Sequence, residues 1–488
     1  MKILVIGLEG AAPEIVFQDE RLTTLRSLMD VGCYGLLEGV IPPSPVPSWM
    51  CLATGQDPGL LGVYGLRNRA DRSYTNLASV DSRTIQAPAM WDRVAEANGR
   101  SILIGVPPGY PPRPIEGLSV GCPLTPGNDL GPYTHPPELA ARIEAIVGPY
   151  PTDVADYRTA DRAALRDRIL DMSRKQFETL RRLMAEETWD YAQFVEVGLD
   201  RIQHAYWRHL DPDDPRHEPD GPHADVVRDY YLQLDGEIAK TLELAGDDAI
   251  VLIASVHGAR RCEGGFAINE WLAREGFLKL KSRPEHVATV ARLDVDWPAA
   301  TAWAEGGYSA RVYLNVKGRE PEGMIDPADY EAARDDLKAR LEAVAGPDGE
   351  PLGVRAIKPE DAYREARGVA PDLIVDFGAM ALRAIGGVGY PSPFLGADEV
   401  GPDDCNPAPD GVFILASSQL PAFGEIEGVR VLDVAPTLLE LAGLPPLPDA
   451  VGRNFLEGRE PTDPAAGPTD LDDDELLRDR LRGLGYIG

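Results

Sequence analysis

The chain has 488 residues, of which 44% are hydrophobic and 7% aromatic, as in globular proteins that bury a large core. Its formal net charge of −31 at pH 7 excludes binding to nucleic acid or to an anionic membrane by electrostatics alone. Five scattered cysteines show no metal-ligand spacing, and the apolar run at 3–8 is too short for a secretory signal. We therefore expect reduced thiols in a cytoplasmic protein without a membrane span.

Strands and helices are predicted to alternate from the beginning of the chain. Residues 3–8 are uniformly apolar, which predicts a parallel strand buried on both faces, and residues 13–32 have helical spacing. A helix is expected near 48–54, after a proline-rich loop, and a strand at 101–106. Proline and glycine crowd residues 107–151, which predicts a long surface loop.

The alternation continues through the middle of the chain. An amphipathic helix is predicted at 160–187, a buried strand at 191–197, a helix at 224–245 and a second buried strand at 249–255. Repeated strand–helix units are typical of an α/β fold. The sequence therefore predicts a doubly wound, mostly parallel sheet with helices on both faces.

An insertion is expected to interrupt this rhythm. Residues 281–365 contain a separate helix near 328–345 and a short strand near 310–316, and are predicted to form an inserted cap subdomain. The core is predicted to be discontinuous and to comprise 1–280 and 366–456.

The last part of the core and the C-terminal tail are each predicted from local sequence patterns. Core elements are expected as strands at 371–377 and 411–417 and a helix at 433–443. Residues 457–488 begin with an acidic, proline-rich stretch and end in a short helical pattern. We predict an acidic linker followed by a C-terminal helix.

Carboxylates and imidazoles follow several of the predicted strands. Glu9 follows the first strand, Asp200 and His204 follow the strand at 191–197, and His257 follows the strand at 249–255. Ligands bind beyond the carboxyl ends of parallel strands, so these residues and Ser44 of the proline-rich loop are expected to meet in one cleft. Such side chains can hold divalent ions that clamp a phosphoryl group.

Longer segments resemble the type I phosphodiesterase / nucleotide pyrophosphatase branch of the alkaline phosphatase superfamily. The resemblance covers most of the chain. It is carried by W-M-C-L-A-T-G at 49–55, G-L-D-R-I-Q-H at 198–204, S-V-H-G at 255–258, V-P-P-G-Y-P-P at 106–112, W-L-A-R-E-G-F-L at 271–278, L-D-V-A-P-T-L-L-E-L-A-G-L-P at 432–445 and the terminal R-G-L-G-Y-I-G. It implies an alkaline phosphatase-like fold, a two-metal site and a Ser or Thr nucleophile.

The same resemblance implies that several site positions have changed. Pro45 stands at the nucleophile position, so a covalent intermediate there would require a shifted nucleophile, Ser44; the alternative is that Ser44 is an ordinary loop serine. Val256 stands where the family has a carboxylate ligand, and Pro407 where it has a histidine. The neighbouring residues 404–406 could substitute only if the loop rearranged.

Four metal ligands implied by the resemblance remain. They are Glu9, Asp200, His204 and His257, of which Asp200 and His204 share a helix face at i and i+4. Two alternatives stay open: Glu9 as a supporting carboxylate, and His257 as a core imidazole. The expected cofactor is one weakly held divalent metal (Zn, Mn or Mg) or none.

Three functions remain open at this point. The first is a binding or regulatory pseudoenzyme, the second an active metal-dependent phosphodiesterase or phosphatase with a rearranged site, and the third a different reaction in the same pocket. The expected ligand is a phosphorylated small molecule or a nucleotide. A protein partner or a homo-oligomer is left open.

Overall fold

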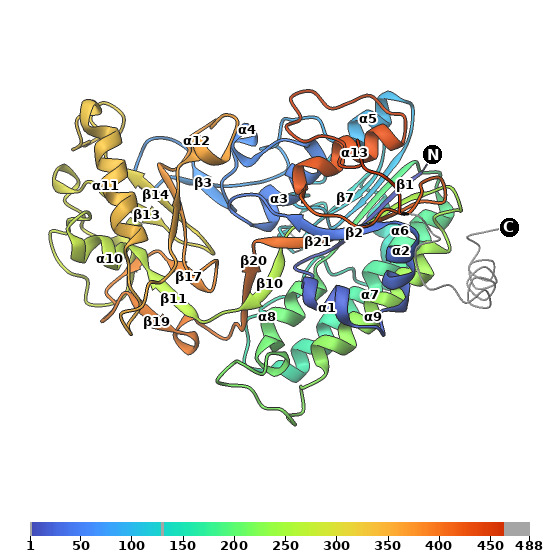
Figure 1. Cartoon of the computed structure of the whole chain (residues 1–488), viewed down its shortest axis with the longest axis horizontal. Coiled ribbons are helices and arrows are strands. Elements are labelled where there is room, and N and C mark those ends of the chain that lie inside the picture. Colours follow the sequence, from blue (N-terminus) through green and yellow to red (C-terminus); the bar gives the residue numbers. More distant parts are fainter. Residues whose placement is uncertain (1, 128–130, 463–488) are drawn as a thin grey trace.

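The central strands of the larger lobe, such as β1, β8 and β9, are buried along their whole length, since helices cover both faces of the sheet. The computed structural model describes residues 2–127 and 131–462, and ten strands of this lobe form one sheet in the order β22–β2–β21–β9–β1–β8–β5–β6–β7, with β23 beside β2 (Figure 1). The five strands from β9 to β6 are parallel, whereas β21 is antiparallel to both of its neighbours. The strands are β1 Ile3–Leu8, β2 Cys33–Glu38, β5 Ser101–Ile104, β6 Gly117–Val120, β7 Thr134–His135, β8 Tyr191–Glu196, β9 Ile250–Ser255, β21 Asp410–Ala416, β22 Gly424–Glu425 and β23 Val429–Arg430.

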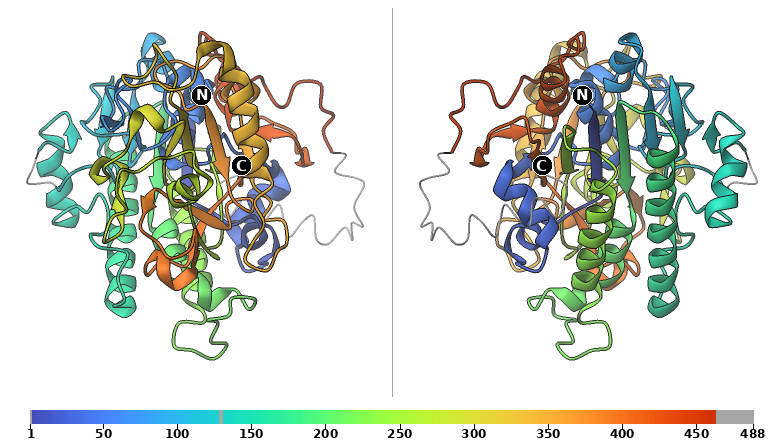
Figure 2. Two further views of the ribbon diagram at one scale, coloured as in Figure 1. Left: turned by 90° about the vertical axis from the view of Figure 1, so that its left-hand side faces the viewer. Right: turned by 90° about the vertical axis from the view of Figure 1, so that its right-hand side faces the viewer.

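Helices cover both faces of this sheet, as the side views show (Figure 2). Leu4 and Ile6 of β1 pack in one core and Ile3 and Val5 in the other, because successive side chains of a strand point to opposite faces. The first face carries α1 Pro13–Gln18, α2 Thr23–Val31, α6 Leu139–Val147, α7 Arg162–Glu186, α8 Gly198–Leu210 and α9 Val226–Leu242. The second carries α3 Pro45–Thr54, α5 Met90–Glu96 and α13 Val434–Leu441.

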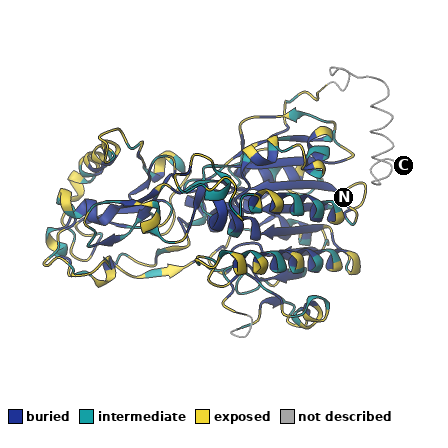
Figure 3. Cartoon of the chain, turned by 90° about the horizontal axis from the view of Figure 1, so that it is seen from below, coloured by how far each residue is buried: buried dark blue, intermediate teal, exposed yellow. Residues whose placement is uncertain are grey.

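The smaller lobe has a separate apolar core that includes Trp303, Phe266 and Phe377. Buried residues run through both lobes, as the colouring of the ribbon shows (Figure 3). The main sheet of the smaller lobe is antiparallel in the order β13–β14–β16–β15, and a second sheet has the order β17–β11–β19. These strands are β11 Gly264–Ala267, β13 Ala302–Glu305, β14 Ala310–Leu314, β15 Arg355–Ile357, β16 Leu373–Asp376, β17 Leu382–Ile385 and β19 Phe394–Gly396. The helices are α10 Ile268–Glu275, α11 Tyr330–Glu342 and α12 Pro359–Ala362.

Short elements complete the described structure. The antiparallel pair β10 and β20 lies where the chain passes between the lobes, with Ala259 opposite Pro407. The remaining elements are α4 Pro58–Leu61, β3 Arg67–Arg69, β4 Leu77–Ser79, β10 Gly258–Arg261, β12 Ala288–Thr289, β18 Gly387–Val388 and β20 Cys405–Ala408. Among the described residues, no helix is both long and apolar enough to cross a membrane.

The predicted α/β class and its mostly parallel sheet are confirmed, but two local expectations are wrong. The strand expected in the core at 371–377 is β16, which pairs with β14 and β15 in the smaller lobe. A short, mostly apolar segment predicts a buried strand without indicating the sheet to which the strand belongs. The smaller lobe therefore extends beyond the expected 281–365 on both sides.

Residues 13–32 are helical, as their spacing predicts, and form two helices; Asp235 of α9 accepts the backbone N–H groups of Thr24 and Leu25 in the first turn of α2. The other error concerns a loop. The expected loop at 107–151 contains β6, β7 and α6. The C-terminal helix predicted within 457–488 lies outside the described residues.

Candidate functional site

Three adjacent parallel strands, β9, β1 and β8, bring the acidic and imidazole side chains to one edge of the sheet. Glu9 directly follows β1, Asp200 lies in the first turn of α8 after β8, and His257 follows β9. Gly10 marks how closely they approach: a Cβ atom there would lie 3.6 Å from His257 Cε1 and 3.7 Å from Asp200 Oδ1, and its φ is +73°. A glycine suits this position because it has no side chain and tolerates positive φ.

Glu9 is held by two donors in a buried pocket. Its Oε1 lies 2.8 Å from His257 Nε2, and its Oε2 accepts the indole N–H of Trp49 at 2.6 Å. The other ring nitrogen of His257 lies 2.8 Å from the carbonyl oxygen of Gly258. Burial alone would lower the pKa of His257, but its bond to the Glu9 carboxylate outweighs that effect and the pKa is raised. The 2.8 Å contact with Glu9 therefore favours the protonated form of the His257 ring.

His204 lies between two carboxylates. Its Nε2 is 3.2 Å from Asp200 Oδ1 and its Nδ1 is 2.5 Å from Asp403 Oδ1. Burial opposes the charged ring, yet the attraction of the two carboxylates raises the pKa of His204 well above its usual value. The same pairing lowers the pKa values of Asp200 and Asp403, although burial acts in the opposite direction. Both nitrogens of His204 therefore face carboxylates, and these contacts favour the protonated ring.

Three arginines contact the two carboxylates beside His204 or lie next to them. Arg201 contacts Asp200 Oδ2 at 2.5 Å and makes a bidentate pair with Asp153 at 2.9 and 2.7 Å. The other two share Asp403: Arg158 Nε lies 2.5 Å and Arg383 Nη2 2.8 Å from its Oδ2. Arg383 belongs to β17 of the smaller lobe, so the network joins the two lobes.

A cleft of about 930 Å³ lies between the lobes in front of this network. Glu9, Ser44 and Asp200 line it from the larger lobe, and Tyr308 and Arg383 line it from the smaller one. His204 and His257 lie behind the lining, and Tyr308 Oη is 3.3 Å from His204 Nε2. The structure thus brings all five expected residues to one region, but the roles assigned to them stay predictions.

Ser44 occupies the N-cap of α3, and Pro45 is the first residue of that helix. Pro45 also lines the cleft, so the position that holds the nucleophile in the resembled family faces the site without a hydroxyl group. Ser48, one turn later, is fully buried. Ser44 is therefore the serine of this segment that faces the cleft.

At the other positions where the resembled family has metal ligands, the side chains either lack a ligand atom or are bonded to other residues. Val256 is buried and apolar, and Pro407 is paired with Ala259 in β20. Asn406 accepts Arg383 Nε at 2.7 Å, and Asp404 accepts Arg208 at 2.6 Å. The side chains of Asp404 and Asn406 are therefore held by arginines, and they do not take the place of the missing histidine.

The donors present do not fit a two-metal centre. Both oxygens of Glu9 and of Asp200, and both nitrogens of His204, already contact protein donors or carboxylates. Within residues 2–127 and 131–462, no group of three or more His, Cys, Asp or Glu is arranged to hold a metal ion. Zinc sites in proteins use at least three protein ligands, and the protein cations here occupy the space beside the carboxylates.

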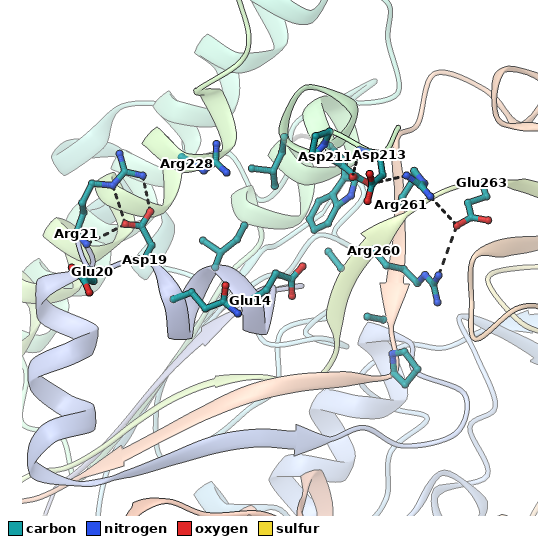
Figure 4. Close-up of a pocket in the computed structure, with 18 residues that line it drawn as sticks. Glu14, Asp19, Glu20, Arg21, Asp211, Asp213, Arg228, Arg260, Arg261 and Glu263 are labelled. Carbon is teal, nitrogen blue, oxygen red and sulfur yellow. Dashed lines mark hydrogen bonds and ion pairs between the residues drawn. The ribbon is translucent and has the colours of Figure 1, made fainter. Parts of the chain in front are cut away.

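A second hollow, of about 950 Å³, lies on the outer side of the larger lobe between α1, the end of α8 and β10 (Figure 4). Its charged groups pair with one another: Arg21 with Asp19, and Arg261 with Asp211 and Glu263. None of the five expected site residues lines it. The cleft between the lobes is therefore the candidate functional site.

Several residues of the site were not predicted from sequence: Asp403, Arg158, Arg201, Arg383 and Tyr308. Asp403 stands next to Asp404, which was considered as a substitute ligand, so an acidic signal was present one residue away. Arg158 and Arg383 come from a loop and from the smaller lobe, and no spacing in the sequence relates them to His204.

Comparisons with known proteins agree with this architecture. A family model for type I phosphodiesterase / nucleotide pyrophosphatase matches residues 3–382. The solved structure of phosphonoacetate hydrolase from Sinorhizobium meliloti 1021 with phosphonoformate is 16% identical, covers 89% of this chain and 94% of its own, and has a TM-score of 0.55. Human ectonucleotide pyrophosphatase / phosphodiesterase 5 is 15% identical, with 92% and 96% covered and a TM-score of 0.49. A search of curated proteins found no match.

Proposed function

The chain belongs to the type I phosphodiesterase / nucleotide pyrophosphatase family of the alkaline phosphatase superfamily, and from this premise we propose that it binds a phosphate ester in the cleft between its lobes without hydrolysing it by the two-metal route. One observation carries the proposal. His204, a metal ligand in the resembled family, is held between Asp200 and Asp403 through both ring nitrogens. Nε2 is the nitrogen that a metal ion would need, because Nδ1 is held by Asp403, and Nε2 already faces Asp200 at 3.2 Å and Tyr308 Oη at 3.3 Å.

The nucleophile position supports the same conclusion. A two-metal site clamps the attacking and leaving oxygens of an in-line displacement. Pro45 offers no attacking oxygen, and Val256 and Pro407 offer no ligand atoms for the metal ions. The defects therefore affect the nucleophile and the ligand set independently, and restoring either alone would leave the reaction incomplete.

Turnover of bis-p-nitrophenyl phosphate with added Zn²⁺, Mn²⁺ or Mg²⁺ tests the hydrolytic part. We expect no release of p-nitrophenol above the buffer rate. Metal-dependent release that disappears in Asp200→Ala but persists in Asp398→Ala, whose side chain is 79% exposed and outside the cleft, would contradict the proposal.

Retained ligand binding is tested separately, by thermal unfolding with and without p-nitrophenyl phosphate. A ligand that binds only the folded state raises the unfolding temperature with its concentration. We expect such a rise in the wild-type protein, and its absence at millimolar ligand would contradict the binding part.

A second candidate is a phosphodiesterase that uses Ser44. The observation in its favour is the position of Ser44 at the N-cap of α3, facing the cleft, whereas Ser48 is fully buried. This candidate predicts turnover that Ser44→Ala abolishes and Ser48→Ala preserves. Turnover that survives both substitutions would exclude Ser44 as the nucleophile.

A further inference from the structure

The cleft has the opposite charge balance to the chain as a whole. The whole sequence carries a formal charge of −31, yet five arginines and only three carboxylates line the cleft: Arg67, Arg158, Arg201, Arg311 and Arg383, with Glu9, Asp200 and Glu305. A concave site lined by one sign of charge concentrates ligands of the other sign. The cleft is therefore suited to an anion, on a surface that otherwise repels anions.

Three of these arginines are fixed at the inner end of the cleft. Arg201 is held by Asp153 and Asp200, while Arg158 and Arg383 share the single carboxylate of Asp403 with His204. Because Arg158 and Arg383 share the one carboxylate of Asp403, the positive charge of these two guanidinium groups is only partly compensated. The guanidinium groups are also held in place before a ligand arrives, which lowers the entropic cost of binding.

Unused donors remain on two of the three guanidinium groups. In residues 2–127 and 131–462, neither Arg158 Nη1 nor Arg383 Nη1 has a hydrogen-bond partner, although the other nitrogens of both groups do. Both residues line the cleft. Guanidinium N–H groups match the oxygens of a phosphate and form charge-assisted hydrogen bonds with them.

The cleft also has an apolar wall. Four large hydrophobic side chains are exposed among the described residues, and two of them, Leu66 at 47% and Val287 at 49%, line this cleft. Val290 and Ile385 line it as well. Exposed apolar side chains gathered in one concave site indicate contact with an apolar part of a ligand.

We propose that Arg158 and Arg383 hold the phosphate group of the ligand without a metal ion, with the positive charge of Arg201 beside them, and that the ligand is a phosphate ester whose apolar substituent lies against Leu66 and Val287. This inference rests on the proposed function, because it assumes that a phosphate ester binds in the cleft. It goes further by assigning the groups that replace the metal ions and the chemical class of the substituent.

Isothermal titration calorimetry on the 488-residue chain in buffer with EDTA tests the proposal, with phenyl phosphate and inorganic phosphate as ligands. We expect phenyl phosphate to bind without metal and more tightly than inorganic phosphate. Arg158→Gln should weaken both ligands about tenfold, as expected for the loss of one charge-assisted hydrogen bond. Arg142→Gln is the matched control, since both side chains are 42% exposed and ion-paired but Arg142 lies on α6, outside the cleft.

The apolar wall is tested with Leu66→Ser and Val287→Ser combined. This variant should weaken phenyl phosphate several-fold and leave inorganic phosphate unchanged. Leu36→Ser is the control, because Leu36 is equally exposed, at 47%, but lies on β2 away from the cleft. The assignment of the apolar wall would be overturned if Leu36→Ser weakened phenyl phosphate binding as much as the combined variant does. It would also be overturned if the combined variant weakened the binding of inorganic phosphate.

Two further results separate this inference from the proposed function. If phenyl phosphate bound only after Zn²⁺ was added, or if Arg158→Gln behaved like Arg142→Gln, the metal-free assignment would fail while phosphate-ester binding stood. If phenyl phosphate and p-nitrophenyl phosphate bound neither with nor without metal, both proposals would fail together.

Discussion

Replacing Asp403 by asparagine isolates the charge at the centre of the ion-pair network. The Asp403 side chain is completely buried and contacts His204 Nδ1 at 2.5 Å, Arg158 Nε at 2.5 Å and Arg383 Nη2 at 2.8 Å. Asparagine has nearly the same volume, so no cavity forms. The substitution removes one negative charge and leaves two buried cations without that partner.

The structure indicates a large cost. Removing one partner of a buried ion pair destabilises a protein by about 3–5 kcal/mol, because the remaining charge is left uncompensated. The Arg158 side chain is 42% exposed, so water screens its share, and His204 keeps its contact with Asp200; we therefore count Arg383 as the cation that loses its carboxylate partner. The amide oxygen still accepts one hydrogen bond. We therefore expect a loss near the lower end of that range, about 3 kcal/mol in the free energy of unfolding.

Urea denaturation at pH 7 measures this loss, and Asp398→Asn is the matched control. Asp398 is 79% exposed and pairs with Arg216 at 3.4 Å, so its loss should cost under about 1 kcal/mol. A two-lobed chain need not unfold in one step, so the variants are compared transition by transition. If Asp403→Asn were no more destabilising than Asp398→Asn, the claim that the Asp403 carboxylate stabilises the buried cations around it would be refuted.

Three other predictions follow from the same contacts. The pKa of His204 is raised in the folded state. The stability that its charge contributes is therefore fully present below the pKa of the unfolded state, about 6.5, and is lost as pH rises through the higher pKa of the folded state. The free energy of unfolding of the wild-type protein should accordingly fall above about pH 6.5. His204→Gln should lessen that fall, and an unchanged slope would contradict it. Trp49→Phe removes the indole donor to Glu9 at 2.6 Å and should cost about 1–3 kcal/mol in urea denaturation; a cost near zero would show that Glu9 does not depend on it. Glu320→Gln strands Arg69, whose side chain is 1% exposed, and should increase hydrogen exchange in the smaller lobe while sparing β1; uniform change in both lobes would refute this.

The larger lobe was predictable because its signals are local. The apolar runs that became β1, β8 and β9 are each bounded by helical patterns, and strand–helix alternation permits few topologies. The smaller lobe was harder to predict, since β16 has the same apolar pattern as a core strand and only its pairing with β14 assigns it. Pattern indicates burial, whereas sheet membership depends on contacts distant in sequence.

Some residues of the candidate site could likewise be predicted from the sequence, and others could not. Glu9, Asp200 and His257 could be placed together from sequence because each follows one of three parallel strands. The charges that neutralise them could not, since Arg383 comes from β17 and Asp403 from the chain before β20. The sequence shows which ligand and nucleophile positions have changed. It does not show that protein cations surround the remaining carboxylates.

The most direct test of the central claim, that protein ion pairs take the place of the metal centre, is anomalous diffraction at the zinc edge from crystals grown with zinc chloride and phenyl phosphate. We predict phosphate density beside Arg158 and Arg383, the contacts of His204 to Asp200 and Asp403 intact, and no zinc peak among these side chains. A zinc peak ligated by Asp200 and His204, with Asp403 displaced from the ring, would contradict the account.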